Sequence, residues 1–487
     1  MITKIIKIEN VGTFKSYSNK SDRSWNGSFN KINLVYGPNG SGKTTLSTIF
    51  NSLSKNKPEL IRYKRTIGSS SSPTISLLDS SARGVIAFKE NEWDGQIKNI
   101  EIFDVHFIED FLFMSSVSHT KNSTNLLSLI LDATGINLKN KHKNLITKRR
   151  VLIQNIKSLK SKKKLNQKEL KNLESNLALN KSAIDKSIDD FQKIASPIFT
   201  KYVQQTNKHL SRFTKTIKIH SLLTPQLSFE SEAFKPSLNL EINGKLIKFK
   251  SPDLSKKIGN AKFTLSEGDK NAVALSFFLA RLDIIGVKEK IIVFDDPLSS
   301  FDKSRKTSTV YLLSKIASEC EQFFLFTHDI FFAKAISDKL DFDNPLNLKI
   351  ERTIHSSILI NHQIETETLS GYHKNLQTIK NYPCLSIKTE LDKRNVIRCI
   401  RPVLESLFKT KYFEYFSLND WLGDIISKIR IEKDAKILMD LTTILPDLIE
   451  LNDFSKSYHH SEIENEPIDD IEIDKYLELL KKTVIKI

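Results

Sequence analysis

The chain has 487 residues, of which 39% are hydrophobic and 27% are charged, and its formal net charge is +17 at pH 7. A chain of this length can bury a full core and is expected to form two or three domains. The longest apolar run, residues 272–287, is interrupted by Arg281 and Asp283, and residues 1–4 lack the layout of a signal peptide. We therefore expect a cytoplasmic protein without a membrane segment.

Two features of the composition bear on partners and cofactors. The excess positive charge is mostly lysine, and the sequence has no arginine-rich stripe with interleaved aromatic residues. Contact with nucleic acid is therefore possible, and codon bias is an equally good explanation of the charge. Cys320, Cys384 and Cys399 lie far apart and form no C-x-x-C pair, which argues against a disulfide framework or a zinc site.

The stretch that organises the chain is residues 37–45, which read G-P-N-G-S-G-K-T-T and fit the pattern G-x-x-x-x-G-K-[ST]. An apolar strand at 31–36 precedes it and a helix can open after it, so backbone N–H groups are expected to face a phosphate chain. Lys43 would reach the β- and γ-phosphates of ATP, and the Thr44 hydroxyl would bind Mg²⁺. The residues predicted to bind the nucleotide here are Asn39, Gly40, Ser41, Gly42, Lys43, Thr44 and Thr45.

Between residues 137 and 212 apolar residues recur three and four positions apart, which is typical of a coiled-coil seam. The lysine-rich stretch 160–164 interrupts this seam, and we interpret it as the tip of an antiparallel hairpin of two helices. One long surface helix with a solvated basic patch is the alternative. The predicted seam residues are Leu145, Leu152, Ile156, Leu159, Leu170, Leu173, Leu177, Ile184, Phe191 and Ile194.

The second half of the nucleotide site is predicted further along the chain. Residues 290–295 form a buried strand that ends in Asp295 and is followed by Asp296, and a second buried strand ends next to His328. Asp295 can hold Mg²⁺, Asp296 can orient or deprotonate the attacking water, and His328 can sense or stabilise the γ-phosphate. Each of these residues alone could be structural, but their order and spacing favour the catalytic interpretation.

Leu265-Ser266-Glu267-Gly268 precedes these two strands in the sequence and looks like the signature sequence of the ABC-class ATPases. Together with the P-loop and the strand-end residues, it makes the chain resemble that family. In that family the signature caps the ATP held by a second head. The resemblance therefore implies that Ser266 and Gly268 face the γ-phosphate in a head-to-head homodimer with two sandwiched ATP molecules, which could assemble further into a higher oligomer. It also implies that Asp302 lies in the loop that crosses between the two sites. An arm between P-loop and signature is similar to the SMC-like branch rather than to membrane transporters.

Two departures from the ABC pattern qualify this resemblance. Many relatives have a glutamate where this chain has Asp296, which is one methylene shorter. Slow hydrolysis is therefore expected, with ATP acting as a clamp or signal. No glutamine-loop residue is evident between Thr45 and Asn137, so the contacts to adenine stay unassigned.

A closer resemblance rests on Asp295-Asp296-Pro297 together with residues 265–270. These are similar to the stand-alone bacterial ATPases of anti-phage defence, which include the ATPase subunit of Septu systems and the ATPase–anticodon-nuclease proteins of the PrrC and RloC type. The resemblance covers residues 1 to about 335. It implies a sensor or regulatory ATPase that works with a separate nuclease effector.

The C-terminal third is expected to be mostly helical and to carry Arg401 and Glu405 on one helix face, with His459 and His460 downstream. An Arg, a Glu four residues later and a downstream His resemble the triad proposed for the anticodon nucleases. Such residues could supply a base, an acid and a cation for attack by a 2′-OH. We favour the alternative, a salt bridge and two surface histidines, because the histidines lie further downstream than the nuclease pattern implies.

The sequence as a whole predicts an α/β fold: an ABC ATPase head (P-loop NTPase) with a short antiparallel coiled-coil insertion and a mainly helical C-terminal module. We expect head lobes at 1–136 and 213–340, the arm at 137–212 and the module at 341–487. The leading hypothesis is an ATP-hydrolysing defence regulator. The first alternative is an anticodon nuclease with its active site in its own module. The second is an SMC-like DNA-repair ATPase, which the short arm without zinc-hook cysteines disfavours.

Overall fold

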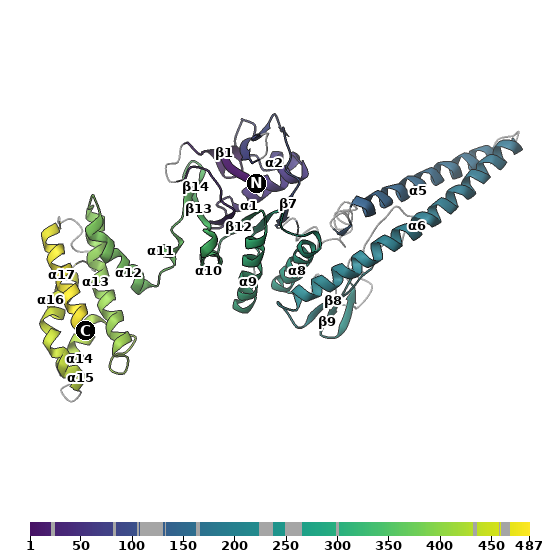
Figure 1. Ribbon diagram of the computed structural model, residues 1–487. Helices are drawn as coiled ribbons and strands as arrows, with labels where there is room; N and C mark the ends of the chain where they lie inside the picture. The colour runs from purple at the N-terminus through teal and green to yellow at the C-terminus, as the bar shows by residue number, and fades with distance from the viewer. Residues whose placement is uncertain are drawn as a thin grey trace. The chain divides into compact units, whose positions relative to one another are not determined.

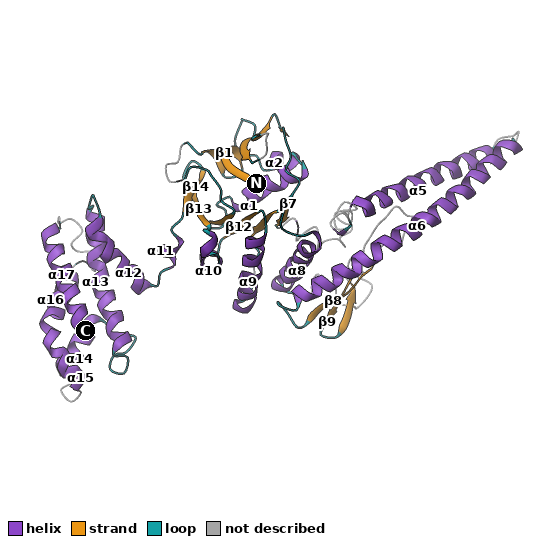
Figure 2. Cartoon of the chain, in the orientation of Figure 1, coloured by secondary structure: helices purple, strands orange, loops and turns teal. Residues whose placement is uncertain are grey.

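The structure of the protein is a computed structural model, shown in Figure 1 and, by secondary structure, in Figure 2. It forms two compact units, Met1–His362 and Gln363–Ile487, and each unit is described here by itself. The structure describes all residues except 21–24, 81–83, 105–106, 108–129, 132, 162–165, 224–236, 249–264, 299–300, 432–435, 457 and 459–467.

A six-stranded sheet forms the centre of the first unit. Five of its strands are parallel, and β14 runs antiparallel to β13 at one edge. Parallel strands end at the same edge of a sheet, so the segments that follow β3, β11 and β12 come together there. In spatial order the strands are β14 (Ser357–Asn361), β13 (Leu346–Arg352), β3 (Ile32–Tyr36), β12 (Gln322–Thr327), β11 (Ile291–Asp295) and β7 (Ile100–Phe103).

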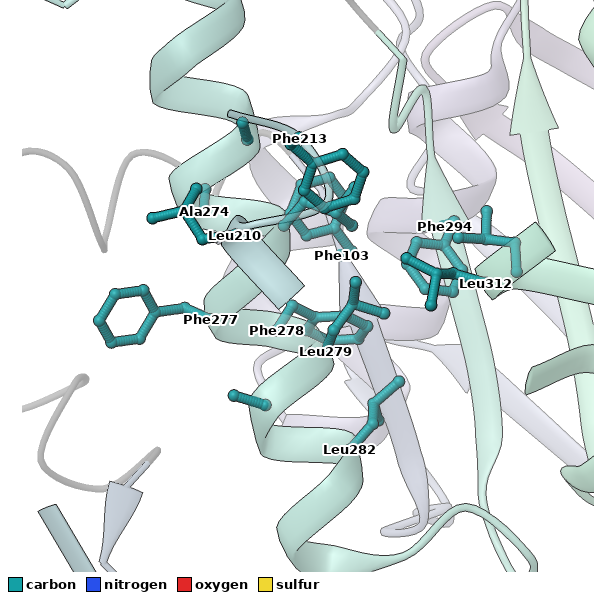
Figure 3. Packing of buried hydrophobic residues seen from close by; sticks show 14 of the residues in the cluster. Phe103, Leu210, Phe213, Ala274, Phe277, Phe278, Leu279, Leu282, Phe294 and Leu312 are labelled. Atoms are coloured by element: carbon teal, nitrogen blue, oxygen red, sulfur yellow. The ribbon is translucent and has the colours of Figure 1, made fainter. Parts of the chain in front are cut away.

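The central strands β11 and β12 are buried on both faces, which explains why they are almost entirely apolar. Side chains of successive residues point to opposite faces, so Ile292 and Phe294 enter one core cluster, whereas Ile291 and Val293 enter the other. Figure 3 shows the first cluster, where Phe294 packs beside helical residues. The sheet is therefore a rigid platform for the polar residues at its carboxyl edge.

Different elements cover the two faces of the sheet. Helices from the second half of the chain join the first core cluster, and α1 joins the second together with a five-stranded antiparallel sheet of order β2-β1-β4-β5-β6. The helices are α1 (Lys43–Lys55), α2 (Glu59–Tyr63), α8 (Glu267–Ile285), α9 (Lys303–Glu319) and α10 (Ile330–Lys339). The strands are β1 (Ile2–Val11), β2 (Phe14–Ser18), β4 (Thr74–Asp79), β5 (Val85–Lys89) and β6 (Glu92–Trp93).

The arm consists of two helices, α5 (Ala133–Lys160) and α6 (Gln167–Leu210), which lie side by side in Figure 1. The Asn180 side chain donates a hydrogen bond to the Leu145 carbonyl, 3.2 Å away, and Lys160 pairs with Glu174 at 3.0 Å. Because residues late in α5 meet residues early in α6, the helices are antiparallel. The predicted hairpin is confirmed, and the alternative of one long helix is wrong.

The buried seam of the arm differs from the prediction at two places. Ile146 is buried where Leu145 was expected, and Ala195 is fully buried beside a half-buried Ile194. The first difference places the polar His142 in the seam, with Nδ1 2.7 Å from the Ser187 hydroxyl. The prediction is therefore off by one residue only at this end of α5, beside the polar pair, whereas Leu152, Ile156 and Leu159 are buried as predicted.

The end of α6 enters the head, where a small antiparallel sheet follows it. Its strands β9 (Ser237–Ile242) and β10 (Lys245–Lys248) are joined by Asn243 and Gly244, whose φ angles of 50° and 76° suit a two-residue hairpin turn. The third strand, β8 (Ile217–Leu223), pairs with β9.

The second unit is helical around its own apolar core, in agreement with the predicted module. The predicted boundary after residue 340 is wrong, because β13 pairs with β3 and extends the head sheet, and the first unit continues to His362. The helices of the second unit are α11 (Ile364–Thr368), α12 (Gly371–Asn381), α13 (Glu390–Lys411), α14 (Leu422–Ile431), α15 (Lys436–Leu441), α16 (Leu445–Lys456) and α17 (Asp470–Lys486).

Candidate nucleotide site

The P-loop leads from β3 into α1. Its packing requires one glycine in the loop itself and one in the turn after β1. Gly42, just before α1, has φ 121°, and a Cβ added there would lie 2.6 Å from the Thr13 hydroxyl. Gly12 has φ 57°, and a Cβ there would lie 2.5 Å from the Thr45 hydroxyl. Both positions combine a left-handed backbone with close packing, so only glycine fits without strain. The loop is thus held tightly between β1 and α1.

Lys43 is buried within the loop that it follows. Its ammonium group donates to the carbonyls of Gly37 and Pro38, at 2.8 and 3.2 Å. It also lies 3.5 Å from a carboxylate oxygen of Asp296, and the lysine side chain is 5% exposed. Lys43 therefore connects the P-loop to the end of β11, as the order of the motifs predicts.

Asp296 is fixed by contacts on both of its carboxylate oxygens. Oδ1 accepts a hydrogen bond from the backbone N–H of His328 at 2.9 Å and lies 2.8 Å from Nδ1 of the same histidine, while Oδ2 faces Lys43. The residue has φ 46°, a left-handed conformation that Asp tolerates better than most residues. The structure thus brings Lys43, Asp296 and His328 together, although they come from three separate motifs.

Asp295 is the buried carboxylate of the site. Burial raises the pKa of Asp295 to about 7, and the negative charges of Asp296 and Asp104 act in the same direction. A hydrogen bond from Thr44 opposes this shift. Its Oδ1 atom is buried and has no hydrogen-bond partner among the described residues. An orphaned carboxylate oxygen beside a threonine hydroxyl fits Mg²⁺, which usually takes one or two protein ligands and completes its shell with waters and phosphates.

Asp104 is a residue of this site that sequence reasoning missed. It follows β7, the neighbour of β11, and is buried. Its carboxylate accepts hydrogen bonds from the Asn51 side chain at 3.0 Å and from the Phe107 backbone at 2.8 Å. Its position after a buried strand is the same signal that identified Asp295. Most of the stretch that follows, where a glutamine loop was sought, lies outside the described residues.

A cavity of about 610 Å³ opens next to the P-loop. Three segments far apart in the sequence line it beside the loop: the turn between β1 and β2, residues 63–67, and the turn between β13 and β14. These segments supply exposed apolar side chains and several cations, a combination that suits a nucleoside phosphate. None of these side chains was predicted from the sequence as part of the site. The side chains in question are Tyr63, Arg65, Ile67, Arg352, Ile354 and His355.

The β13–β14 hairpin is attached directly to the P-loop. The Ser357 hydroxyl donates to the Ser41 carbonyl at 2.6 Å, and the Thr13 hydroxyl donates to the same carbonyl at 3.0 Å. The Ser357 backbone N–H in turn donates to the Thr13 carbonyl at 3.0 Å. Two hydroxyls on one carbonyl fix the orientation of the loop, and with it the direction of the N–H groups near Gly40.

The signature residues lie at the start of α8. Ser266 caps this helix through hydrogen bonds between its hydroxyl and Asp269, and Gly268 is buried in the first turn. Arg305 joins Asp269 at 2.7 Å, and its backbone N–H donates to Asp302, the cap of α9, at 2.9 Å. Ser266 and Asp302 are thus connected through Asp269 and Arg305, and Gly268 lies in the same first turn of α8. None of the three predicted residues lines the cavity at the P-loop of the same chain.

Asp302 is ionised in its cap. Hydrogen bonds from the Arg305 backbone and the Ser304 side chain hold the pKa of Asp302 below its usual value. An ionised carboxylate suits the positive end of a helix, so the capping role alone accounts for this shift.

The predicted nuclease residues are only partly brought together. Arg401 and Glu405 are both on α13, with 3.9 Å between Nη2 and Oε1. Glu405 is buried, and its Oε1 atom accepts a hydrogen bond at 2.9 Å from the backbone N–H of Leu422, the first residue of α14. Glu405 therefore holds the start of a neighbouring helix. His459 and His460 lie outside the described residues.

Within the part of the chain that the structure describes, no helix is both long and apolar enough to cross a membrane. In the same ranges no group of three or more His, Cys, Asp or Glu side chains could hold a metal ion. A Mg²⁺ ion in this protein would accordingly depend on the nucleotide for part of its coordination.

Comparison with known proteins places this geometry in a family. The family model AAA_13, described as an AAA domain, matches residues 10–226 and 137–483. The energy-coupling factor transporter ATP-binding protein EcfA of Methanosphaera stadtmanae is 28% identical over 118 residues, which cover 23% of this chain and 40% of that protein. The chromosomal cassette SCCmec type IVc protein CR006 of Staphylococcus aureus is 35% identical over 71 residues, 13% of this chain and 10% of that protein. The matches thus span less than half of either relative.

Among solved structures, two Smc head domains are similar to the chain. The head with an extended coiled coil bound to the C-terminal domain of ScpA, from Pyrococcus furiosus, has a TM-score of 0.44 at 13% identity and covers 78% of this chain and 100% of that one. The head with coiled coil and joint from Pyrococcus yayanosii has a TM-score of 0.42 at 11% identity and covers 75% of this chain and 98% of that one.

The family model accounts for almost the whole chain, and the P-loop, the paired aspartates and the histidine meet at one sheet edge as an ATPase requires. The chain belongs to the AAA_13 family of AAA-domain proteins and is an ATPase of the AAA/ABC class.

Proposed function

We propose that this ATPase is the sensor or regulatory subunit of a bacterial anti-phage defence system and that it controls a separate nuclease effector. The observation that carries the proposal is the contrast between the two units. The first holds a connected set of catalytic groups, Lys43, Asp296 and His328. In the second, Glu405 is buried as the acceptor for the start of α14, so it is not available as the acid or base of a nuclease.

The residues of the head have separate tasks in this proposal. Lys43 binds the β- and γ-phosphates, and Asp296 orients the attacking water and accepts its proton, held in place by His328. Thr44 and Asp295 hold Mg²⁺, which neutralises charge on the phosphates. The short reach of the Asp296 carboxylate makes hydrolysis slow, which suits a switch whose output depends on how long ATP stays bound.

A second copy of the chain completes the site. Ser266 is exposed at the start of α8, and it does not line the cavity beside the P-loop of its own chain. In an ABC-type dimer the partner presents its signature to that cavity, so two ATP molecules hold two heads together. The link from Asp269 through Arg305 to Asp302 would make signature and crossing loop move as one body.

A second candidate function is an anticodon nuclease within the chain. One contact favours it: the Arg398 guanidinium donates to the Tyr458 carbonyl at 2.8 Å, and Arg398 is on the same helix as Arg401 and Glu405. Tyr458, which directly precedes His459 and His460 in the sequence, is therefore held against α13, the helix that carries Arg401 and Glu405. The capping role of Glu405 weighs against this function.

The deciding experiment examines tRNA in phage-infected and uninfected cells that express the chain alone. The matched variant is Arg401→Ala with Glu405→Gln, because glutamine keeps an acceptor for the Leu422 N–H. Intact tRNA in all cells supports the regulator. Cleaved tRNA that disappears in the variant contradicts it and places the nuclease in this chain.

A further inference from the structure

A second cavity, of about 620 Å³, lies in the first unit and shares no lining residue with the cavity beside the P-loop. The last turns of α6 and α8 and one face of α9 form it, together with the loop after α8. Helix α6 belongs to the arm, and Ser266 and Asp302 cap the starts of α8 and α9. An occupant would therefore touch the arm helix and the two helices that follow these caps.

The cations that line this cavity outnumber the acids. Arg212, Lys288 and Lys290 form no ion pair with a carboxylate among the described residues, whereas the charge of Lys208 acts on Asp283. Two of the three acids beside them already have partners: Asp283 contacts His209 at 2.8 Å, and Glu319 lies 4.0 Å from Lys315. The cavity is left with uncompensated positive charge, which attracts anions.

The floor of the cavity is apolar and its rim carries an aromatic ring. Leu279, Leu282 and Leu312 are all buried, and Figure 3 labels them within the packed core. At the rim the Tyr311 ring is 54% exposed, and the Arg212 guanidinium lies 5.9 Å from its centre. A flat ring can stack on such a tyrosine while an anionic group reaches the cations.

One buried polar atom lacks a partner here. His209 is 6% exposed, and while its Nε2 contacts Asp283, its Nδ1 has no hydrogen-bond partner among the described residues. That nitrogen is itself buried, so the cations, the tyrosine and the size of the cavity are what suit it to a ligand. Size agrees as well, because ligand cavities are commonly about 300–1,000 Å³.

We propose that this cavity binds a nucleoside phosphate at a site separate from the P-loop: the phosphates meet Arg212, Lys288 and Lys290, and the base lies near Tyr311. A tyrosine ring stacks on any base, so an adenine nucleotide is a sufficient probe. The site does not depend on the catalytic proposal, because none of its residues belongs to the P-loop site.

The test counts bound nucleotide per full-length chain by equilibrium dialysis with labelled AMP-PNP, an ATP analogue that is not hydrolysed. We expect two per chain in the wild type and one in Lys43→Ala, which keeps only the new site. In Arg212→Ala/Lys288→Ala the weaker class of sites should lose roughly tenfold or more in affinity, since each lost cation removes a charge-assisted contact. Both residues are exposed, so the variant is expected to fold.

The matched control is Lys193→Ala/Lys201→Ala, which removes two exposed cations from α6 outside the cavity. It should keep two nucleotides per chain. One nucleotide in the wild type and none in Lys43→Ala would overturn the proposal and leave the P-loop site intact. If instead the wild type and Lys43→Ala bind equally, with loss only in the Arg212 variant, the new site stands and the P-loop assignment fails.

Discussion

The Asp296 carboxylate receives two contacts from one residue, because the backbone N–H and the Nδ1 atom of His328 both lie within 2.9 Å of its Oδ1 atom. A residue that is held at two points cannot rotate away without losing both. Its second oxygen remains next to Lys43, at 3.5 Å, on the side of the P-loop. His328 is therefore placed as the residue that sets the direction of the Asp296 carboxylate, which we propose to be catalytic.

Replacing Asp296 by alanine should separate binding from hydrolysis. We expect ATP turnover to fall by roughly 10²–10⁴, the usual contribution of a positioned acid or base, while ATP stays bound. Turnover is measured by phosphate release, and Asp338→Ala, at an exposed pair on α10, serves as control. Hydrolysis at the normal rate in Asp296→Ala would show that another group activates the water.

Replacing Lys43 by alanine should abolish tight nucleotide binding at the P-loop. The lysine is the buried cation of the loop, so its loss removes a charge-assisted contact to the phosphates and leaves the Gly37 and Pro38 carbonyls without their donor. Competition with labelled ATP gives the affinity of the P-loop when Lys43→Ala is compared in the Arg212→Ala/Lys288→Ala background, which weakens the proposed second site. A dissociation constant within threefold of the wild type would refute the assignment of this loop.

Gly12 and Gly68 offer a matched pair for the packing of the P-loop. Both have positive φ, but an added Cβ at Gly12 would lie 2.5 Å from the Thr45 hydroxyl, whereas nothing lies within 4 Å at Gly68. Gly68→Ala should cost about 1–2 kcal/mol from backbone strain alone, and Gly12→Ala should cost about 1–3 kcal/mol more. Thermal unfolding of the two variants measures the difference, and equal melting temperatures would contradict it.

Glu405 tests whether the second unit needs this carboxylate for stability or for chemistry. Glu405→Ala leaves the buried Leu422 N–H without its acceptor, which should cost about 1–3 kcal/mol. Glu405→Gln keeps an acceptor and should be nearly as stable as the wild type. Circular dichroism against temperature compares them. If glutamine destabilises the unit as much as alanine does, the negative charge is needed and the capping explanation is insufficient.

Arg305 should hold the signature residues at the start of α8 in a fixed position relative to α9. Its guanidinium bonds Asp269 at 2.7 Å and the Phe213 carbonyl at 2.9 Å, so Arg305→Ala frees the start of α8 from α9 and from the segment after α6. We expect a fall in kcat with little change in KM, and partial recovery in Arg305→Lys, which keeps the charge but not the two-sided contact. Lys303→Ala, an exposed neighbour, is the control, and an unchanged kcat in Arg305→Ala would rule out this role.

The meeting of Lys43, Asp296 and His328 could be predicted because its signals are local. Buried parallel strands are apolar throughout, so Asp295, Asp296 and His328 mark where β11 and β12 end, and strands that end at one edge bring their last residues together. The same logic applies to Asp104 after β7. It was missed because β7 is short and a single aspartate after it has no motif around it.

The remainder of the site depends on pairings that lie far apart in the sequence. The position of β13 beside β3, which places Arg352 at the nucleotide cavity, is not encoded in the residues of β13 itself. In the same way Arg401 and Glu405 suggest a salt bridge by their spacing. The stronger contact of Glu405 is with Leu422, 17 residues on, across a turn that no periodicity describes.

The hairpin that fixes the P-loop also sets where the chain can be divided. Ser357 holds the Ser41 carbonyl, and the head ends only five residues later, at His362. Every hydrogen bond that the hairpin makes to the P-loop is therefore already in place before the second unit begins. Evolution could exchange everything after residue 362 for a different domain and keep the nucleotide site whole, whereas a fusion point before β13 would remove part of that site.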